Sequence, residues 1–217
     1  MAPQIREFRT RMSIPLTTKL LHAKRQDGQP AFNFMDLRRL SIDFDPSEEH
    51  NIRFLLRNTK SLERLYLSVG FDQSLMGLCD ILSSHASTLK VLDLTTVPIY
   101  DVHQPLAGLC EALEAMTGRY KLETLSFEVL VEYGRETLDS IGPIIQKVEK
   151  VLVKPGWSAL RQVSIKIAIA SFAGNGRTLY EALQSLPDRY LSHLSKLESV
   201  DFDYLVHAYK GSYRTMF

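Results

Sequence analysis

Potential nucleophiles and metal ligands occur in this chain of 217 residues, but their spacing matches no catalytic or metal-binding motif. The histidines are scattered over six positions: His22, His50, His85, His103, His193 and His207. No two of them have the spacing at which a pair of imidazoles binds one metal ion. Cys79 and Cys110 each lack a second ligand nearby, which favours two buried structural thiols over a metal pair. We therefore expect a protein that is not an enzyme and that binds no metal or cofactor.

Two other segments resemble ligand sites only in part. The acidic cluster at 43–49 lacks the spacing and the central glycine of an EF-hand. Within it, Asp45 is well placed to cap a helix, because Pro46 suits the first helical position. The segment 174–178, Gly-Asn-Gly-Arg-Thr, has arginine where a phosphate-binding P-loop needs lysine, and serine at 171 where it needs its first glycine. We interpret the first segment as a helix start and the second as a turn.

A six-residue phrase recurs along the chain, with apolar residues at its first, fourth and sixth places. Its copies begin at Leu37, Leu62, Leu89, Leu122, Leu160 and Leu197. Successive copies start 25, 27, 33, 38 and 37 residues apart, which leaves room for a strand, a helix and two connections in each unit. The segments 77–82 and 108–113 support the repetition, since both read Gly-Leu-Cys-acid-apolar-Leu. The pattern predicts repeated strand–helix units.

Such units predict an α/β solenoid of about six irregular repeats, with a curved parallel sheet inside and helices outside. The second place of the phrase tests the register, because its charges alternate in sign. These residues are Arg38, Glu63, Lys90, Glu123, Arg161 and Glu198. In a parallel stack with the phrases aligned, each would lie between charges of opposite sign.

The helices expected after the strands have apolar faces that would cover the sheet. Leu55 and Leu56 mark the first such face, and the third helix ends near Gly118. The fourth helix is expected over about 135–151, with a kink or a false start at Gly142–Pro143. Trp157 is interpreted as packing at a strand–helix junction, with a binding role as the less favoured alternative.

The third, fifth and seventh places of each phrase would point away from the helices, into the concave wall. Arg64 and Tyr66 are the expected anchors for a protein partner, because Arg and Tyr are enriched among residues that dominate binding energy. A merely solvated inner face is the alternative. The candidate protein-binding residues are Arg39, Ser41, Arg64, Tyr66, Asp93, Thr95, Ser126, Glu128, Ser164, Lys166, Asp201 and Asp203.

Composition limits the partners and the compartment. Lys and Arg number 26 against 25 Asp and Glu, so nothing points to nucleic acid or to an anionic membrane. No apolar run approaches the roughly 18 residues of a membrane span, and no secretory signal is expected. Two cysteines favour a reducing compartment, cytoplasmic or nuclear. The expected divisions are residues 1–31 as an atypical repeat or cap, 32–205 as the solenoid and 206–217 as a tail.

Over roughly Phe32–Tyr204 these phrases resemble the leucine-rich-repeat family. Segments such as Thr59–Leu67 resemble the C-terminal repeat region of fungal F-box proteins. The resemblance implies that the chain recognises a protein substrate for an SCF-type (cullin-RING) ubiquitin ligase, whose adaptor would bind an F-box not visible in this sequence. Its ninth places depart from the family, which usually has Asn or Cys there: Asp45, Gly70, Val97, Leu130, Ala168 and Leu205.

Two alternatives remain open. Alternating strands and helices also permit an α/β enzyme with an open parallel sheet and an unrecognised active site, in which polar residues at strand ends would converge in one pocket. A non-catalytic scaffold or a truncated F-box-like protein is the other possibility.

Overall fold

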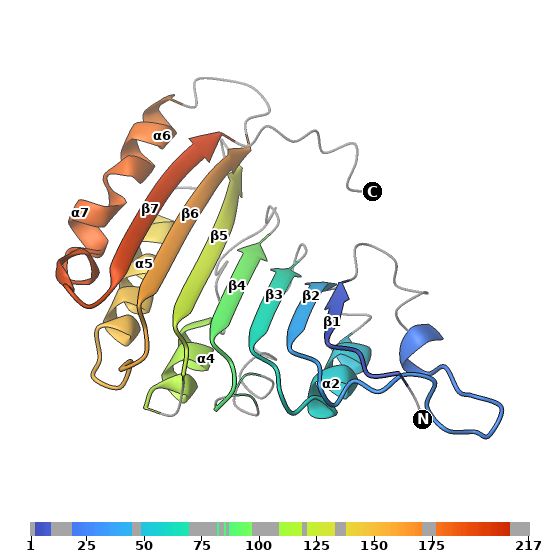
Figure 1. Cartoon of the computed structure of the whole chain (residues 1–217). Helices are drawn as coiled ribbons and strands as arrows, with labels where there is room; N and C mark the ends of the chain where they lie inside the picture. Colours follow the sequence, from blue (N-terminus) through green and yellow to red (C-terminus); the bar gives the residue numbers. More distant parts are fainter. Residues whose placement is uncertain are drawn as a thin grey trace.

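A computed structural model of the chain contains one sheet of seven parallel strands, paired in sequence order from β1 to β7 (Figure 1). The structure describes residues 3–9, 19–44, 49–69, 82, 85, 87–96, 109–118, 121–132, 138–170 and 177–208. The strands are β1 (Glu7–Arg9), β2 (Arg39–Phe44), β3 (Arg64–Val69), β4 (Val91–Thr96), β5 (Thr124–Glu132), β6 (Gln162–Ala170) and β7 (Asp201–Ala208). The expected α/β class with a parallel sheet is therefore confirmed, and β1 contains Phe8 of the atypical N-terminal segment.

The recurring phrase sets the register from β2 to β6, where equal places are paired Cα to Cα. Leu40, Leu65, Leu92, Leu125 and Val163 form the fourth-place row, and each is fully buried. The backbone carbonyls of Arg38, Glu63, Lys90 and Glu123, at second places, each accept two N–H groups from the next unit, whereas that of Arg161 accepts one, from Asp201 N. Glu63 N and Arg64 N, for example, both donate to Arg38 O at 2.9 Å. The fourth- and sixth-place side chains of every strand point to one face. A shift of one residue in the pairing of two strands would therefore expose the core.

In the last strand, β7, the places of the phrase fall on different residues from those predicted, and this assignment of places is called the frame of the strand. Asp201 pairs with Gln162, a third-place residue, so the sixth phrase lies two residues later than Leu197 predicts. Phe202 and Tyr204 thus occupy the fourth and sixth places, and Val200 takes the second place in place of Glu198. The predicted frame was wrong because Leu197, Val200 and Phe202 offer equivalent apolar spacing. A slip of two residues preserves the face on which each side chain lies.

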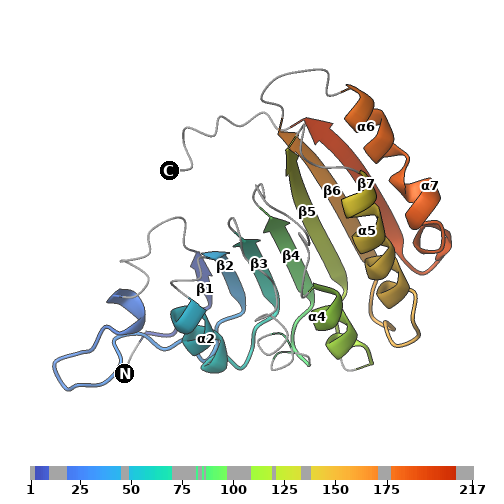
Figure 2. The ribbon, with the colours of Figure 1, turned by 180° about the vertical axis from the view of Figure 1, so that it is seen from behind.

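The described helices lie on one face of the sheet, as the two opposite views show (Figures 1 and 2). They are α2 (Glu49–Arg57), α4 (Leu109–Met116), α5 (Leu138–Leu152), α6 (Arg177–Gln184), α7 (Leu186–Tyr190) and the 3₁₀ turn η3 (Leu194–Lys196). Leu55 and Leu56 of α2 are buried, as expected. The opposite face of the sheet, on which no described helix lies, is called the open face below.

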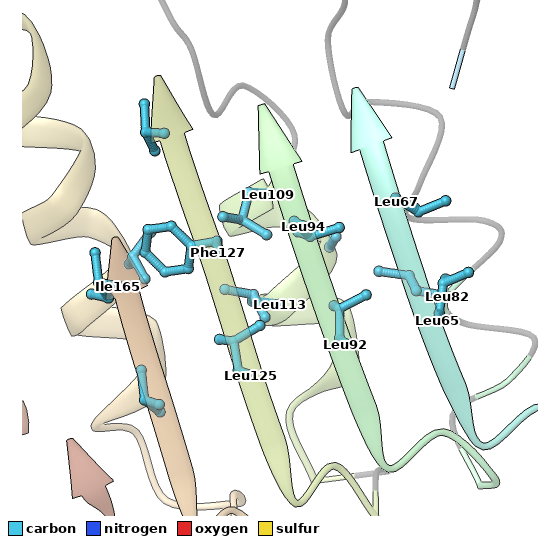
Figure 3. Packing of buried hydrophobic residues seen from close by; sticks show 14 of the residues in the cluster. Leu65, Leu67, Leu82, Leu92, Leu94, Leu109, Leu113, Leu125, Phe127 and Ile165 are labelled. Atoms are coloured by element: carbon cyan, nitrogen blue, oxygen red, sulfur yellow. The ribbon is translucent and has the colours of Figure 1, made fainter. Parts of the chain in front are cut away.

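The core fills the space between the strands and these helices. Leu109 and Leu113 of α4 lie against the leucines of β4 and β5 and against Phe127 (Figure 3). Each fully buried leucine of this kind stabilises the fold by about 1.5–3 kcal/mol. Since every unit contributes side chains to the layer shared with its neighbours, no unit has a core of its own.

Helix α5 is continuous through Gly142 and Pro143, so of the two alternatives expected there, a kink or a false start, the false start is wrong. Pro143 removes one N–H···O=C bond from the helix but does not end it. Gly142 is placed against α7: a Cβ built on it would lie 2.7 Å from Cζ of Tyr190. The glycine therefore allows the two helices to approach closely.

Polar atoms of buried and half-buried side chains bond the carbonyl groups at several helix ends. His85 Nε2 donates to Leu56 O at 3.0 Å, at the end of α2. Trp157 Nε1 donates to Val151 O at 3.0 Å, and Tyr204 Oη donates to Leu183 O at 2.7 Å. Helices leave such carbonyls without intrahelical partners. The packing interpretation of Trp157 is thus supported by a contact at the end of α5.

Within the described ranges no helix is both long and apolar enough to cross a membrane. Several expectations lie outside those ranges: the cap at Asp45, the thiol of Cys79, most of the helix around Leu78 and the turn at 174–176.

Candidate functional site

The open face of the sheet presents side chains in three rows that run across the strands. The third-place row is Glu7, Arg39, Arg64, Val91, Thr124, Gln162 and Asp201, and the fifth-place row is Arg9, Ser41, Tyr66, Asp93, Ser126, Ser164 and Asp203. The seventh-place row is Ser68, Thr95, Glu128, Lys166 and Leu205. All twelve candidate residues lie in these rows, because alternate residues of a strand share a face.

Exposure differs along the rows although the residues share a face. Arg39, Arg64, Asp201 and Asp203 are exposed. Tyr66 and Asp93 are half-buried, whereas Ser164 is only 8% exposed. The two arginines are therefore open to solvent, and the centre of the face is more enclosed.

Second-place charges form ion pairs at the beginning of the strands. Arg38 Nη1 lies 3.6 Å from Glu63 Oε1, and Lys90 Nζ lies 3.7 Å from Glu123 Oε1. The predicted alternation therefore produces cross-strand pairs between β2 and β3 and between β4 and β5. It does not extend to Glu198, since the frame of β7 places Val200 beside Arg161. Exposed pairs of this kind stabilise by at most about 1 kcal/mol each.

Charged groups gather near the centre of the open face. Burial raises the pKa of Asp93 above its ordinary value, while the charge of Lys166 lowers it and that of Glu128 raises it again. The three side chains come from β4, β5 and β6. A carboxyl group with a shifted pKa and specific charged neighbours is a frequent mark of a functional site.

His207 joins this cluster from β7, and sequence reasoning missed it. Its Nε2 lies 3.2 Å from Glu128 Oε1, two strands away. Nearby, Ser164 Oγ donates to Asp203 Oδ2 at 3.2 Å. The signal available in the sequence was the alternation of Phe202, Tyr204 and Val206, which puts His207 on the open face in either frame of β7.

The arrangement of these groups suits binding by charge and hydrogen bonds. Ser164 is bonded to a carboxylate, whereas a serine nucleophile needs a neighbouring base such as histidine. Burial, helped by Glu111 and Glu114 and opposed by Lys147, raises the pKa of Cys110 to about 11, so its thiol is protonated at neutral pH. Among the described residues, no three His, Cys, Asp or Glu side chains are placed to hold a metal ion.

A separate cavity of about 400 Å³ lies at the N-terminal end, between α2 and the segment before β2. Phe32, Phe34, Met35 and Phe54 supply most of its apolar lining, and Arg25 contributes a charged group. Arg25 is already paired with Asp27 at 2.6 Å. This cavity contains none of the twelve candidate residues.

Comparisons of the chain with protein-family models, with curated protein sequences and with solved structures each find no match. The interpretation of the open face rests on the chain's own geometry.

Proposed function

We propose that the chain is a leucine-rich-repeat solenoid whose open face is a concave wall that binds a protein partner. The observation that carries the proposal is the row pattern: a parallel sheet with polar and charged side chains aligned on the face opposite the described helices. Strands that pair in sequence order, each packed with helices on the other face, are typical of repeat solenoids.

Tyr66 and Arg64 are the proposed anchors of the partner. Tyr66 is half-buried near the middle of the face, and Arg64 is exposed beside it on the same strand. An aromatic ring with a polar end and a guanidinium can combine apolar contact with directed hydrogen bonds. The polar groups are spread along rows that cross all the strands, an arrangement suited to an extended contact.

Affinity capture from native extract tests this proposal, with the wild type compared with an Arg64→Ala/Tyr66→Ala variant. We expect the variant to lose specific partners that the wild type retains. Arg57→Ala/Tyr180→Ala is the matched control, because it removes the same two residue types from α2 and α6 on the helical side. Identical partner lists for wild type and the open-face variant would refute the proposed role of the face.

We further propose that the partner is a substrate of an SCF-type ubiquitin ligase. The support is the resemblance of the repeats to the C-terminal region of fungal F-box proteins. Co-purification of the product of the full gene with a cullin-RING adaptor, together with a longer cellular lifetime of the captured partner after gene deletion, is the expected result. Unchanged lifetimes of all captured partners would contradict the ligase role.

A further inference from the structure

Charge is separated along two of the three rows of the open face. In the third- and fifth-place rows, strands β1–β3 carry Arg9, Arg39 and Arg64 against Glu7 alone. In the same rows, strands β4–β7 carry Asp93, Asp201 and Asp203 and no Lys or Arg. The separation is confined to these rows, because the seventh-place row has charges of both signs.

The basic half contains two arginines that form no ion pair with any described residue. Arg39 and Arg64 are Cα partners on neighbouring strands and both are exposed. Glu7 is engaged with Arg9 at 2.9 Å and Glu63 with Arg38 at 3.6 Å, and no carboxylate among the described residues lies within 4 Å of Arg39 or Arg64. Like charges side by side on adjacent strands are unfavourable. An anionic group from a partner would relieve that repulsion.

The acidic half contains carboxylates that a cationic partner would neutralise. Asp201 and Asp203 are exposed, and the internal polar partner of Asp203 is the neutral hydroxyl of Ser164. Asp93 lies half-buried on the neighbouring side of Tyr66, its Cα partner on β3. Cationic side chains of a partner would neutralise Asp201 and Asp203, whereas Asp93 already has Lys166 near it. Tyr66 marks the boundary between the two halves.

We propose that the open face binds an extended peptide segment of defined charge order, with acidic residues over β2–β3, an apolar centre at Tyr66 and basic residues over β5–β7. This inference rests on the proposed function and specifies its partner. From β2 to β7 the rows span five strand spacings, about 24 Å at 4.8 Å each. An extended chain covers that distance with about seven residues. The two rows lie about 7 Å apart along the strands, which suits a single peptide.

Synthetic peptides test the charge order. The block peptide has four glutamates, a Gly-Leu-Leu-Gly centre and four lysines, and the alternating peptide has the same composition with glutamate and lysine interleaved on both sides of the centre. Fluorescence anisotropy at low salt should give the block peptide a Kd lower by about tenfold or more, because only its order matches the face. Salt should reduce the difference, since exposed charges are screened.

Charge reversals identify the surface responsible. Arg39→Glu/Arg64→Glu and Asp201→Lys/Asp203→Lys should each weaken binding of the block peptide by about tenfold. Combining all four substitutions keeps the net charge of the wild type. It should restore binding of the block peptide with its two ends exchanged on the open face. Photo-cross-linking from one end of the peptide detects this change of direction. Arg57→Glu/Lys150→Glu, on exposed helix positions, is the control and should change nothing. Thermal unfolding verifies that every variant is folded.

Equal affinity for both peptides, no binding of either, or an equal loss in the helix control would overturn the proposed charge order. The protein-binding function is judged separately by the capture experiment. If Arg64→Ala/Tyr66→Ala removes a native partner while the peptides are not distinguished, the face binds proteins and only the proposed polarity is wrong.

Discussion

Asp93 is a carboxylate whose ionisation opposes folding. Partial burial raises its pKa above the ordinary 3.8, with Lys166 opposing the shift and Glu128 adding to it. The folded chain therefore retains this proton to a higher pH than the unfolded chain. The resulting destabilisation is absent below pH 3.8 and is complete once the pH has passed the raised pKa. A stability cost at this position is expected if the carboxylate serves binding.

Replacing Asp93 by Asn should consequently raise the free energy of unfolding at pH 7, because the amide has nearly the same shape and no charge. Urea unfolding measured between pH 7 and pH 4 should show the advantage of Asp93→Asn shrinking as the pH falls toward 3.8. Asp201→Asn is the control and should stay within about 0.5 kcal/mol of wild type, since Asp201 is exposed. Lower stability of Asp93→Asn at neutral pH would show that the charge is instead stabilising.

His85 should make the folded protein less stable in acid, in contrast to Asp93. It is 3% exposed, and burial lowers its pKa below 6.5 although the bond to Leu56 O favours the charged form. Below pH 6.5 the unfolded chain binds a proton at His85 more readily than the folded chain does. The free energy of unfolding therefore decreases as the pH is lowered. We expect His85→Gln to lose about 1 kcal/mol at pH 7.5 and to gain on the wild type at pH 5. A difference in urea midpoint that is independent of pH would contradict this role.

At the scale of elements, the turns after α4 and α5 contact each other through two glycines. Gly118 N donates to Gly156 O at 3.3 Å, so the end of one unit bonds the end of the next. Gly118 has φ +80° and Gly156 has φ +125°. The second value lies in a region that is almost restricted to glycine.

The two glycines make a matched pair of substitutions. Gly118→Ala should cost about 1 kcal/mol from backbone conformation alone, because open space surrounds its Cβ position. Gly156→Ala should cost more, about 2–4 kcal/mol, since its Cβ would also lie 3.0 Å from Gly118 N and 2.8 Å from Thr117 Cγ2. Denaturant unfolding measures both values. Equal decreases in the free energy of unfolding would contradict the prediction, because the turn after α5 would then accommodate the added methyl group at Gly156.

Element-level features differ in how far the sequence predicts them. The strands β2–β6 follow from apolar residues at fixed places, because one face must be buried and that requirement selects a single register. The frame of β7 does not follow, since its apolar residues fit two frames that share a face. Helix α5 was predicted over about 135–151, but Gly142–Pro143 also allowed a false start, which is wrong, and only the position of Tyr190 explains the glycine.

The same limit applies to the candidate site. Alternation placed Arg64, Tyr66 and Asp93 on the open face correctly, because it needs only the period of a strand. It could not show that Glu128 reaches His207 two strands away, which depends on the relative frames of β5 and β7. Nor could it distinguish exposed Asp201 from half-buried Asp93, since exposure depends on neighbouring strands.

At the scale of the whole molecule, the strands differ in length and in the number of neighbouring strands along the sheet. Strand β1 has three residues and pairs with β2 on one side. Strands β5 and β6 each have nine residues, and their sixth-place side chains, Phe127 and Ile165, are fully buried. Because each strand pairs with the strands next to it in sequence, we expect local stability to follow such differences.

Hydrogen exchange should therefore show a gradient along the stack, with the backbone amides of β1 exchanging fastest and those of β5 and β6 slowest. Leu92→Ala removes a fully buried side chain at the centre and should cost about 2–5 kcal/mol, raising exchange in every strand. Phe8→Ala, in β1, should raise exchange in β1 and β2 only, because the later units retain their own contacts. Mass-spectrometric exchange on peptides from each strand separates the two cases. If Phe8→Ala accelerates β5–β7 as strongly as Leu92→Ala does, the molecule opens as one cooperative unit and the description by neighbouring repeats fails.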